Sequence, residues 1–216
     1  PPPPRPTGAL RPTVPRREGL VAPRRLLGTE VSAIGLGAMR LSTGDRPDRQ
    51  QAIAVLHAAW EAGLDWVDTA DSYGKDSSDT GHNEALIAEA LRTWEGPPIR
   101  VITKVGLTRP GGRWVPDLGP ERLARVARAR CEALGVEAID LLQLHVMPTR
   151  QPLGEALAPL IALREEGVVR HIGLCNAKPA HLDAALALTP IAAVQCALSA
   201  LDKASLPMVE ACHRHG

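Results

Sequence analysis

The chain has 216 residues, of which 44% are hydrophobic and 23% charged, and it carries 25 Lys and Arg against 24 Asp and Glu. No run of about eighteen apolar residues occurs, which excludes a membrane-spanning helix. Because many arginines lie near the N-terminus, the rest of the chain is mildly acidic, which argues against a nucleic-acid groove.

The first 25 residues contain eight prolines, six arginines and one glutamate, without hydrophobic periodicity. Such a segment cannot bury enough apolar surface to offset the entropy of ordering it. We therefore expect a disordered tail over residues 1–25 and a folded domain over 26–216. The prolines and the absence of Ser argue against a transit peptide.

From residue 26 onward, short apolar runs alternate with longer stretches at helical spacing, with Pro at helix starts and Gly at helix ends. This alternation predicts repeated βα units. The interior Pro159 is expected to kink or delay its helix. The expected strands are 31–37, 64–68, 99–104, 139–145, 168–175 and 191–197. The expected helices are 47–62, 83–94, 120–135, 153–166, 179–188 and 207–216.

Six βα units are compatible with a doubly wound open sheet or with an unfinished barrel. The expected strands are apolar on both faces, as when helices cover one side and a packed barrel interior the other. A complete barrel typically needs about 250 residues. We therefore expect an α/β chain that forms an incomplete (β/α)8 TIM barrel, truncated after its sixth unit.

Four expected strands end on a polar or ionisable residue: Asp68, Lys104, His145 and Asn176. Parallel strands bring such ends to one face, where parallel α/β proteins place their chemistry. Simpler readings exist for each residue taken alone. Asp68 and Asn176 could be helix caps, Lys104 a solvated amine and His145 a core histidine. Their joint placement favours a site.

Tyr73 is the single tyrosine of the chain, and it follows Asp68 closely. A free tyrosine has a pKa near 10, so a proton-donating tyrosine needs a nearby cation to stabilise its phenolate. Lys104 could supply that charge, Asp68 could hold the ammonium, and His145 could hydrogen-bond a substrate oxygen. This set predicts acid catalysis at a carbonyl group.

Several segments together resemble the aldo-keto reductase family. Residues 68–74 read Asp-Thr-Ala-Asp-Ser-Tyr-Gly and match the family pattern Asp-x-Ala-x-x-Tyr-Gly. Further segments match in order, and the resemblance covers about residues 24–216. These further segments are 83–91, 101–104, 139–145 and 167–176.

The resemblance implies an (α/β)8 barrel, an NADP(H) cofactor and reversible reduction of aldehydes or ketones. By position, Tyr73 is then the general acid, Lys104 and Asp68 tune it, and His145 orients the carbonyl. The implied cofactor-binding residues are Gly37, Ala38, Met39, Asp68, Cys175, Asn176 and Gln195, with Asn176 and Gln195 on the nicotinamide carboxamide.

The chain departs from the family pattern at two positions. Cys175 stands where family members place a Ser, and Leu198 lies where an aromatic residue is usual. The family also carries cofactor-binding residues after its seventh and eighth strands, which lie beyond the sixth unit expected here.

Three hypotheses follow. The first is an NADP(H)-dependent oxidoreductase that reduces small-molecule aldehydes or ketones. The second is a catalytically impaired remnant or interaction module that associates through exposed strand edges. The third is a regulatory subunit that senses the state of the cofactor.

The cysteines, Cys131, Cys175, Cys196 and Cys212, form no CxxC pair, which predicts reduced thiols and a cytoplasmic protein. Cys212 is followed by His213 and His215, but histidines two apart on a helix face different directions, so no metal site is expected.

Overall fold

The computed structural model of the protein describes residues 22–216. It begins with an antiparallel hairpin of β1 (Arg24–Leu26) and β2 (Thr29–Val31). Leu27 and Gly28 between them have positive φ angles of 53° and 75°, as in a two-residue type I′ turn. Residues 1–21 of the predicted tail lie outside the described residues. Its last two residues, 24 and 25, belong to β1.

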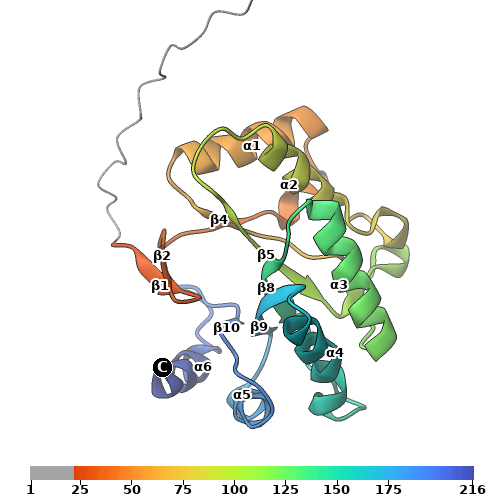
Figure 1. The fold of residues 1–216 in the computed structure, drawn as a ribbon, viewed down its shortest axis with the longest axis vertical. Helices are drawn as coiled ribbons and strands as arrows, with labels where there is room; N and C mark the ends of the chain where they lie inside the picture. The colour runs from red at the N-terminus through yellow and green to blue at the C-terminus, as the bar shows by residue number, and fades with distance from the viewer. Residues whose placement is uncertain (1–21) are drawn as a thin grey trace, which may run out of the picture.

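A parallel sheet of six strands forms the centre of the described chain, in the order β10-β9-β8-β5-β4-β3. The sheet curls, and helices follow its strands on the outside (Figure 1). This arrangement confirms the predicted incomplete (β/α)8 barrel. The strands are β3 (Leu36–Gly37), β4 (Trp66–Asp68), β5 (Arg100–Val105), β8 (Ile139–Leu144), β9 (Val169–Cys175) and β10 (Ala193–Gln195).

Six α-helices are assigned in residues 22–216, and they lie where the sequence pattern places them, with ends shifted by a few residues. Pro159 neither delays the start of its helix nor interrupts it. The helices are α1 (Arg49–Glu61), α2 (His82–Arg92), α3 (Pro120–Leu134), α4 (Leu153–Glu165), α5 (Pro179–Leu186) and α6 (Leu206–His215). No helix in this part of the chain is both long enough and apolar enough to cross a bilayer.

The first predicted strand, 31–37, is wrong in its extent, because Val31 ends β2 and only Leu36–Gly37 pairs with β4. The intervening polar groups are used elsewhere. The backbone N–H and the hydroxyl of Ser32 both donate to the Asp65 carboxylate at 2.9 Å. The indole N–H of Trp66 donates to the Ser32 carbonyl at 3.0 Å, so this carbonyl also has a partner outside the sheet ladder.

A small hairpin after β5 has no counterpart in the sequence prediction. It consists of β6 (Leu107–Thr108) and β7 (Val115–Pro116), joined through the 3-10 turn η3 (Pro110–Gly112). Each strand has only two residues, too few for an alternating pattern to be visible in the sequence. The hairpin matters because it carries Trp114 to the functional site.

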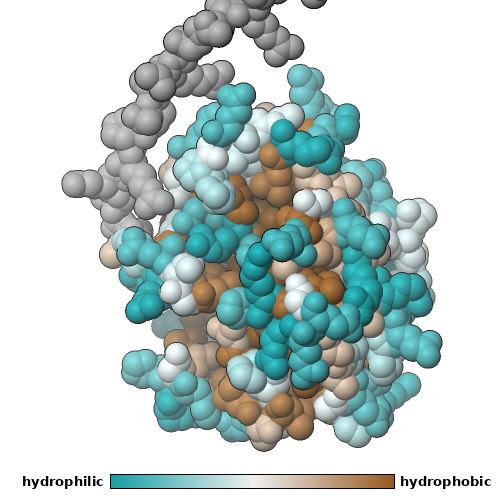
Figure 2. All heavy atoms as spheres, viewed as in Figure 1, coloured by the Kyte–Doolittle hydropathy of each residue, from teal (hydrophilic) through white to brown (hydrophobic). Residues whose placement is uncertain are grey.

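The barrel is held by two apolar clusters. The larger joins β8, β9, α3 and α4 and contains Leu142, Leu144, Leu157 and Leu160, all fully buried. The smaller joins α1 and α2 to β4 and contains Leu56 and the nearly buried Trp60. On the face shown in Figure 2, polar side chains cover most of the surface, and apolar patches show between them in the upper, middle and lower parts of the view.

Candidate active site

The predicted strand-end residues lie at the carboxyl ends of four adjacent strands of the sheet, β4, β5, β8 and β9. Asp68 closes β4, Lys104 is next to last in β5, His145 follows β8, and Asn176 follows β9. Because these strands are parallel, their carboxyl ends meet on one side of the sheet. The structure therefore brings together side chains that are far apart in the sequence.

Lys104 is 1% exposed, and its ammonium donates to three groups. The Nζ atom lies 2.7 Å from each carboxylate oxygen of Asp68, 2.9 Å from the Thr69 carbonyl and 3.0 Å from the Tyr73 hydroxyl. Burial alone would lower the pKa of Lys104, but the Asp68 carboxylate and the Tyr73 hydroxyl outweigh it and raise this pKa. Lys104 is therefore a fixed positive charge at neutral pH.

Tyr73 is 6% exposed, and its ring lies beside the Lys104 ammonium, with 4.9 Å between Nζ and the ring centre. Burial raises the pKa of Tyr73 above its ordinary value of 10, and the positive charge of Lys104 opposes this increase. The direction of the Lys104 effect is the one expected from the sequence, but removal of the phenol from water has the larger effect on this pKa. Tyr73 therefore holds its proton at neutral pH.

His145 packs edge-on against Tyr73, with the two ring centres 5.9 Å apart. Burial, assisted by the charge of Lys104, lowers the pKa of His145 to about 3, so the imidazole is neutral. Its Nδ1 atom is buried and has no hydrogen-bond partner among the described residues. Such an unpaired polar atom is unusual in a protein interior and is more consistent with a ligand-binding group than with a satisfied core histidine.

Asn176 adopts a left-handed backbone conformation with φ of 57°. Its N–H donates to the Gln195 carbonyl at 2.9 Å, and its side-chain amide donates to the His145 carbonyl at 3.1 Å. The N-cap of α5 is Lys178, so Asn176 is not the helix cap that the sequence also allowed. Asn tolerates this conformation better than most residues, which suits it to a sharp turn at a strand end.

The side chain of Cys175 contacts those of both Asn176 and Gln195. Its Sγ lies 3.7 Å from Gln195 Oε1, and the Asn176 amide donates to it at 3.3 Å. Burial raises the pKa of the Cys175 thiol to about 11, although Lys104 opposes the shift. The thiol is therefore protonated at neutral pH and can donate weakly to Gln195.

The predicted turn over Gly37, Ala38 and Met39 borders the same region. The Ala38 N–H donates to the Asp68 carbonyl at 2.9 Å, and the Ala38 side chain is fully buried. Asn83 fixes the turn, since its side-chain amide donates to the Ala38 carbonyl at 2.8 Å. Only Met39 of the three reaches the cleft described below.

A cleft of about 430 Å³ opens at this end of the barrel. Asp68 is not part of its wall and lies behind Lys104, with which it pairs. Cys196 and Ala197 line the cleft and were missed by the sequence analysis, although both follow directly on Gln195. The lining residues are Met39, Tyr73, Lys104, His145, Cys175, Asn176, Gln195, Cys196 and Ala197.

Trp114 is a further residue that the sequence analysis missed. Its ring centre lies 6.2 Å from that of Tyr73 and 6.3 Å from that of His145, and the side chain is 44% exposed. The available signal was compositional: Trp114 is one of only four tryptophans and stands in a loop rich in Gly and Pro.

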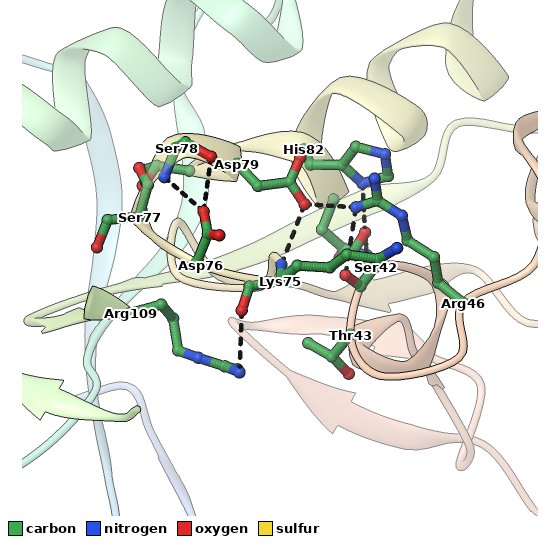
Figure 3. Close-up of polar contacts among 12 residues, drawn as sticks. Ser42, Thr43, Arg46, Lys75, Asp76, Ser77, Ser78, Asp79, His82 and Arg109 are labelled. Atoms are coloured by element: carbon green, nitrogen blue, oxygen red, sulfur yellow. Dashed lines mark hydrogen bonds and ion pairs between the residues drawn. The ribbon is translucent and has the colours of Figure 1, made fainter. Parts of the chain in front are cut away.

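A polar network flanks the site on the side of α2 (Figure 3). Arg46 pairs with Asp79, whose carboxylate also accepts from the Lys75 N–H at 3.0 Å. The hydroxyl of Ser42 bonds His82 Nδ1 at 2.8 Å. These contacts tie the loop after Tyr73 to the turn after β3.

Two buried acids lie behind the site and were also missed. Asp71 and Glu84 are fully buried, and the arginines Arg122 and Arg130 of α3 each place a guanidinium nitrogen 3.5 Å from one of them. Burial raises the pKa of each carboxyl to about 7, while the arginines oppose this increase.

Taken together, the geometry supports proton donation to a developing negative charge. A protonated phenol touches a fixed cation, and a neutral imidazole faces the same space. These are the elements of general acid catalysis with electrostatic stabilisation at a carbonyl oxygen.

A sequence profile described as the aldo/keto reductase family matches residues 33–216. Among curated proteins, an uncharacterized oxidoreductase from Schizosaccharomyces pombe is 32% identical over 192 residues, covering 86% of this chain and 60% of its own length. A probable aldo-keto reductase from Glycine max is 37% identical over 174 residues, covering 78% of this chain and 48% of its own length. A pyridoxine 4-dehydrogenase from Escherichia coli is 30% identical over 202 residues, covering 88% of this chain and 68% of its own length.

Two solved structures superpose well. An aldo-keto reductase from Bacillus halodurans in its holo form matches with a TM-score of 0.77 and 27% identity, over 90% of this chain and 63% of its own. A glycerol dehydrogenase from Gluconobacter oxydans matches with a TM-score of 0.78 and 27% identity, over 89% of this chain and 60% of its own. The chain thus spans about half to two thirds of the length of these relatives.

Proposed function

This chain belongs to the aldo/keto reductase family, and from that membership we propose that it is an oxidoreductase that reduces the carbonyl groups of small aldehydes or ketones. The observation that carries the proposal is the position of the Lys104 ammonium, which donates both to Asp68 and to the Tyr73 hydroxyl within a cleft. A buried lysine with these two partners is costly for folding and is well explained by catalysis.

In this proposal Tyr73 is the general acid. Its hydroxyl donates a proton to the carbonyl oxygen as that oxygen gains negative charge. The phenolate that remains is stabilised by the Lys104 ammonium 3.0 Å away. Asp68 holds the ammonium in position and compensates its charge, and His145, being neutral, donates a hydrogen bond to the same carbonyl oxygen.

The residues present fit a nicotinamide cofactor. Asn176 and Gln195 bring amide groups to the cleft, which suits recognition of a carboxamide. The space beside the Gly37 backbone is open, since a Cβ atom built there would meet nothing within 4 Å. We propose that Gly37, Ala38 and Met39 border the cofactor and that Cys175 orients Gln195. When bound, the cofactor supplies the hydride. NADP(H) is the form proposed, on the family resemblance, and a cytoplasmic location is proposed with it.

The test is NADPH oxidation followed by absorbance with a panel of aldehydes. Pyridoxal and glyceraldehyde belong in the panel because relatives are named for pyridoxine and glycerol dehydrogenation, and benzaldehyde serves as a neutral aromatic probe. Tyr73→Phe removes only the hydroxyl and should lower kcat by about 100-fold or more. Equal rates for the two proteins would refute the assigned acid.

A second candidate, a non-catalytic interaction module, is favoured by one observation. In the described sheet β3 and β10 each pair with a single neighbour, which leaves two strand edges free to pair with another chain. Light scattering during an NADPH titration separates the candidates. A monomer that binds NADPH at micromolar concentration would eliminate the second one.

A further inference from the structure

Arg109 is a charged residue near the cleft whose charge is not matched by a paired acid. Its guanidinium carbon lies 3.9 Å from the centre of the Trp114 ring. Its Nη2 donates to the Lys75 carbonyl across 3.4 Å, a long contact, and its Nε is buried with no partner among the described residues. No ion pair found in residues 22–216 includes Arg109.

Two acids of the neighbouring loop, Asp76 and Asp79, are engaged by other groups. Figure 3 shows the Asp76 carboxylate facing Ser78, whose N–H and hydroxyl donate to it at 2.9 Å and 2.6 Å. These bonds lower the pKa of Asp76 most, and the Arg109 charge contributes only a smaller part. Asp79 pairs with Arg46 instead. The guanidinium therefore retains capacity for an additional anionic partner.

The position of Arg109 relative to the proposed acid fits a small substrate. Both groups lie against Trp114, whose ring centre is 6.2 Å from that of Tyr73 and 3.9 Å from the guanidinium carbon. The guanidinium carbon therefore lies at most about 10 Å, the sum of these two separations, from the centre of the Tyr73 ring. A benzene ring with one substituent at each end reaches across a separation of this order.

Among the described residues, none that lines the cleft carries an uncompensated positive charge. Lys104 is the only residue with a formal charge among those that line it, and that charge is compensated by Asp68. An anionic group on a substrate would therefore gain little within the cleft and most at its rim. A guanidinium suits this role because its planar fork binds carboxylates and phosphates in a bidentate manner.

We propose that Arg109, stacked on Trp114, binds the anionic group of the substrate, so that the site acts on carbonyl compounds that carry a carboxylate or a phosphate. Trp114, which is 44% exposed, would support the body of such a substrate. This inference rests on the proposed function, since it assigns the substrate class of the same site.

The test compares matched pairs of substrates in the full chain. The carboxylate arm uses 4-carboxybenzaldehyde against 4-methylbenzaldehyde, and the phosphate arm uses glyceraldehyde 3-phosphate against glyceraldehyde. We expect kcat/KM to favour the anionic member of at least one pair, and Arg109→Gln to reduce that preference by about tenfold, as for loss of a charge-assisted hydrogen bond. The arm that responds identifies the anion.

Arg113→Gln is the matched control, because Arg113 lies in the same loop, is exposed and forms no ion pair in the described chain. It should leave the preference unchanged. If Arg109→Gln lowers kcat/KM equally for both members of each pair, Arg109 only tethers its loop to Lys75, and the inference is overturned. An unchanged preference in Arg109→Gln overturns it as well.

Binding without turnover separates this inference from the proposed function. Tryptophan fluorescence can be titrated with 4-carboxybenzyl alcohol and 4-methylbenzyl alcohol. Tighter binding of the carboxylate that depends on Arg109 supports the inference even if no aldehyde is reduced. Turnover of aldehydes without any such preference leaves the proposed function standing and sinks this inference alone.

Discussion

Lys104 and Asp68 form a buried ion pair in which Nζ lies 2.7 Å from both carboxylate oxygens. Neither side chain has water to replace its partner, because the exposed fractions of the side chains are 1% and 10%. Removing one partner of such a pair leaves an uncompensated charge in the interior. The pair therefore links the stability of the fold to the proposed chemistry.

Asp68→Asn should lower the free energy of unfolding by about 3–5 kcal/mol, because it strands the Lys104 ammonium. Urea denaturation measures this loss. The double variant Asp68→Asn with Lys104→Met removes both charges, so it should regain much of the stability while remaining inactive. If the double variant were as unstable as the single one, burial of an unpaired charge would not be the cause.

His145 should make the protein sensitive to acid. Its pKa is lowered to about 3 in the folded chain, against an ordinary value of 6.5. Between these values the unfolded chain binds a proton that the folded chain does not, so stability falls as the pH is lowered from about 6.5 toward 3. His145→Gln should lose less stability than the native chain between pH 6.5 and 4.5, as measured by urea midpoints. Identical losses would contradict the lowered pKa.

Glu84 should act in the opposite direction. Burial raises its pKa to about 7 from 4.5, so the folded chain holds a proton that the unfolded chain releases. Stability contributed by the protonated form is present at low pH and is lost as the pH rises from about 4.5 to 7. Glu84→Gln should therefore gain stability relative to the native chain at pH 8, by on the order of 2 kcal/mol.

Glu89→Gln is the control for this prediction, since Glu89 lies on the same helix and pairs with Arg49 near the surface. It should not reproduce the gain in stability at pH 8, because it removes a partly exposed ion pair rather than a fully buried carboxylate. A native-like slope in Glu84→Gln would show that Arg130, 3.5 Å from the carboxylate, keeps Glu84 ionised throughout.

Sequence reasoning located the strand ends well because hydrophobic runs and the punctuation by Gly and Pro are local signals. Asp68, Lys104 and His145 needed only the rule that parallel strands end on one face. The contacts of Trp114 were not predictable in this way, because a two-residue strand gives no periodic pattern and its partner rings come from distant segments. The same holds for Glu84, which reads as an ordinary acid on a helix until the packing of α3 against it is known.

The direction in which the pKa of Tyr73 is shifted could not be predicted from the sequence. The sequence indicates which cation lies nearby but not how thoroughly the phenol is removed from water. Desolvation depends on the whole surrounding structure, and here it outweighs the effect of Lys104.

Asn83 is predicted to position the turn over Gly37, Ala38 and Met39 through its buried amide. Its Oδ1 accepts from the Thr69 hydroxyl at 2.6 Å, and its Nδ2 donates to the Ala38 carbonyl and to the Ser42 hydroxyl, both at 2.8 Å. These contacts join the segment that follows Asp68 to the turn that follows β3. Asn83→Ala would leave several buried polar groups unpaired, so it should lower the free energy of unfolding by about 2–4 kcal/mol.

The same substitution should weaken NADPH binding more than it lowers kcat, because Asn83 lies outside the cleft and acts on the turn rather than on Tyr73. Fluorescence titration with NADPH and steady-state kinetics measure the two effects. Asn83→Asp keeps the acceptor for Thr69 but loses the amide donors, so it should resemble Asn83→Ala in cofactor binding. A fall in kcat with unchanged NADPH affinity would show that Asn83 supports the acid instead of the turn.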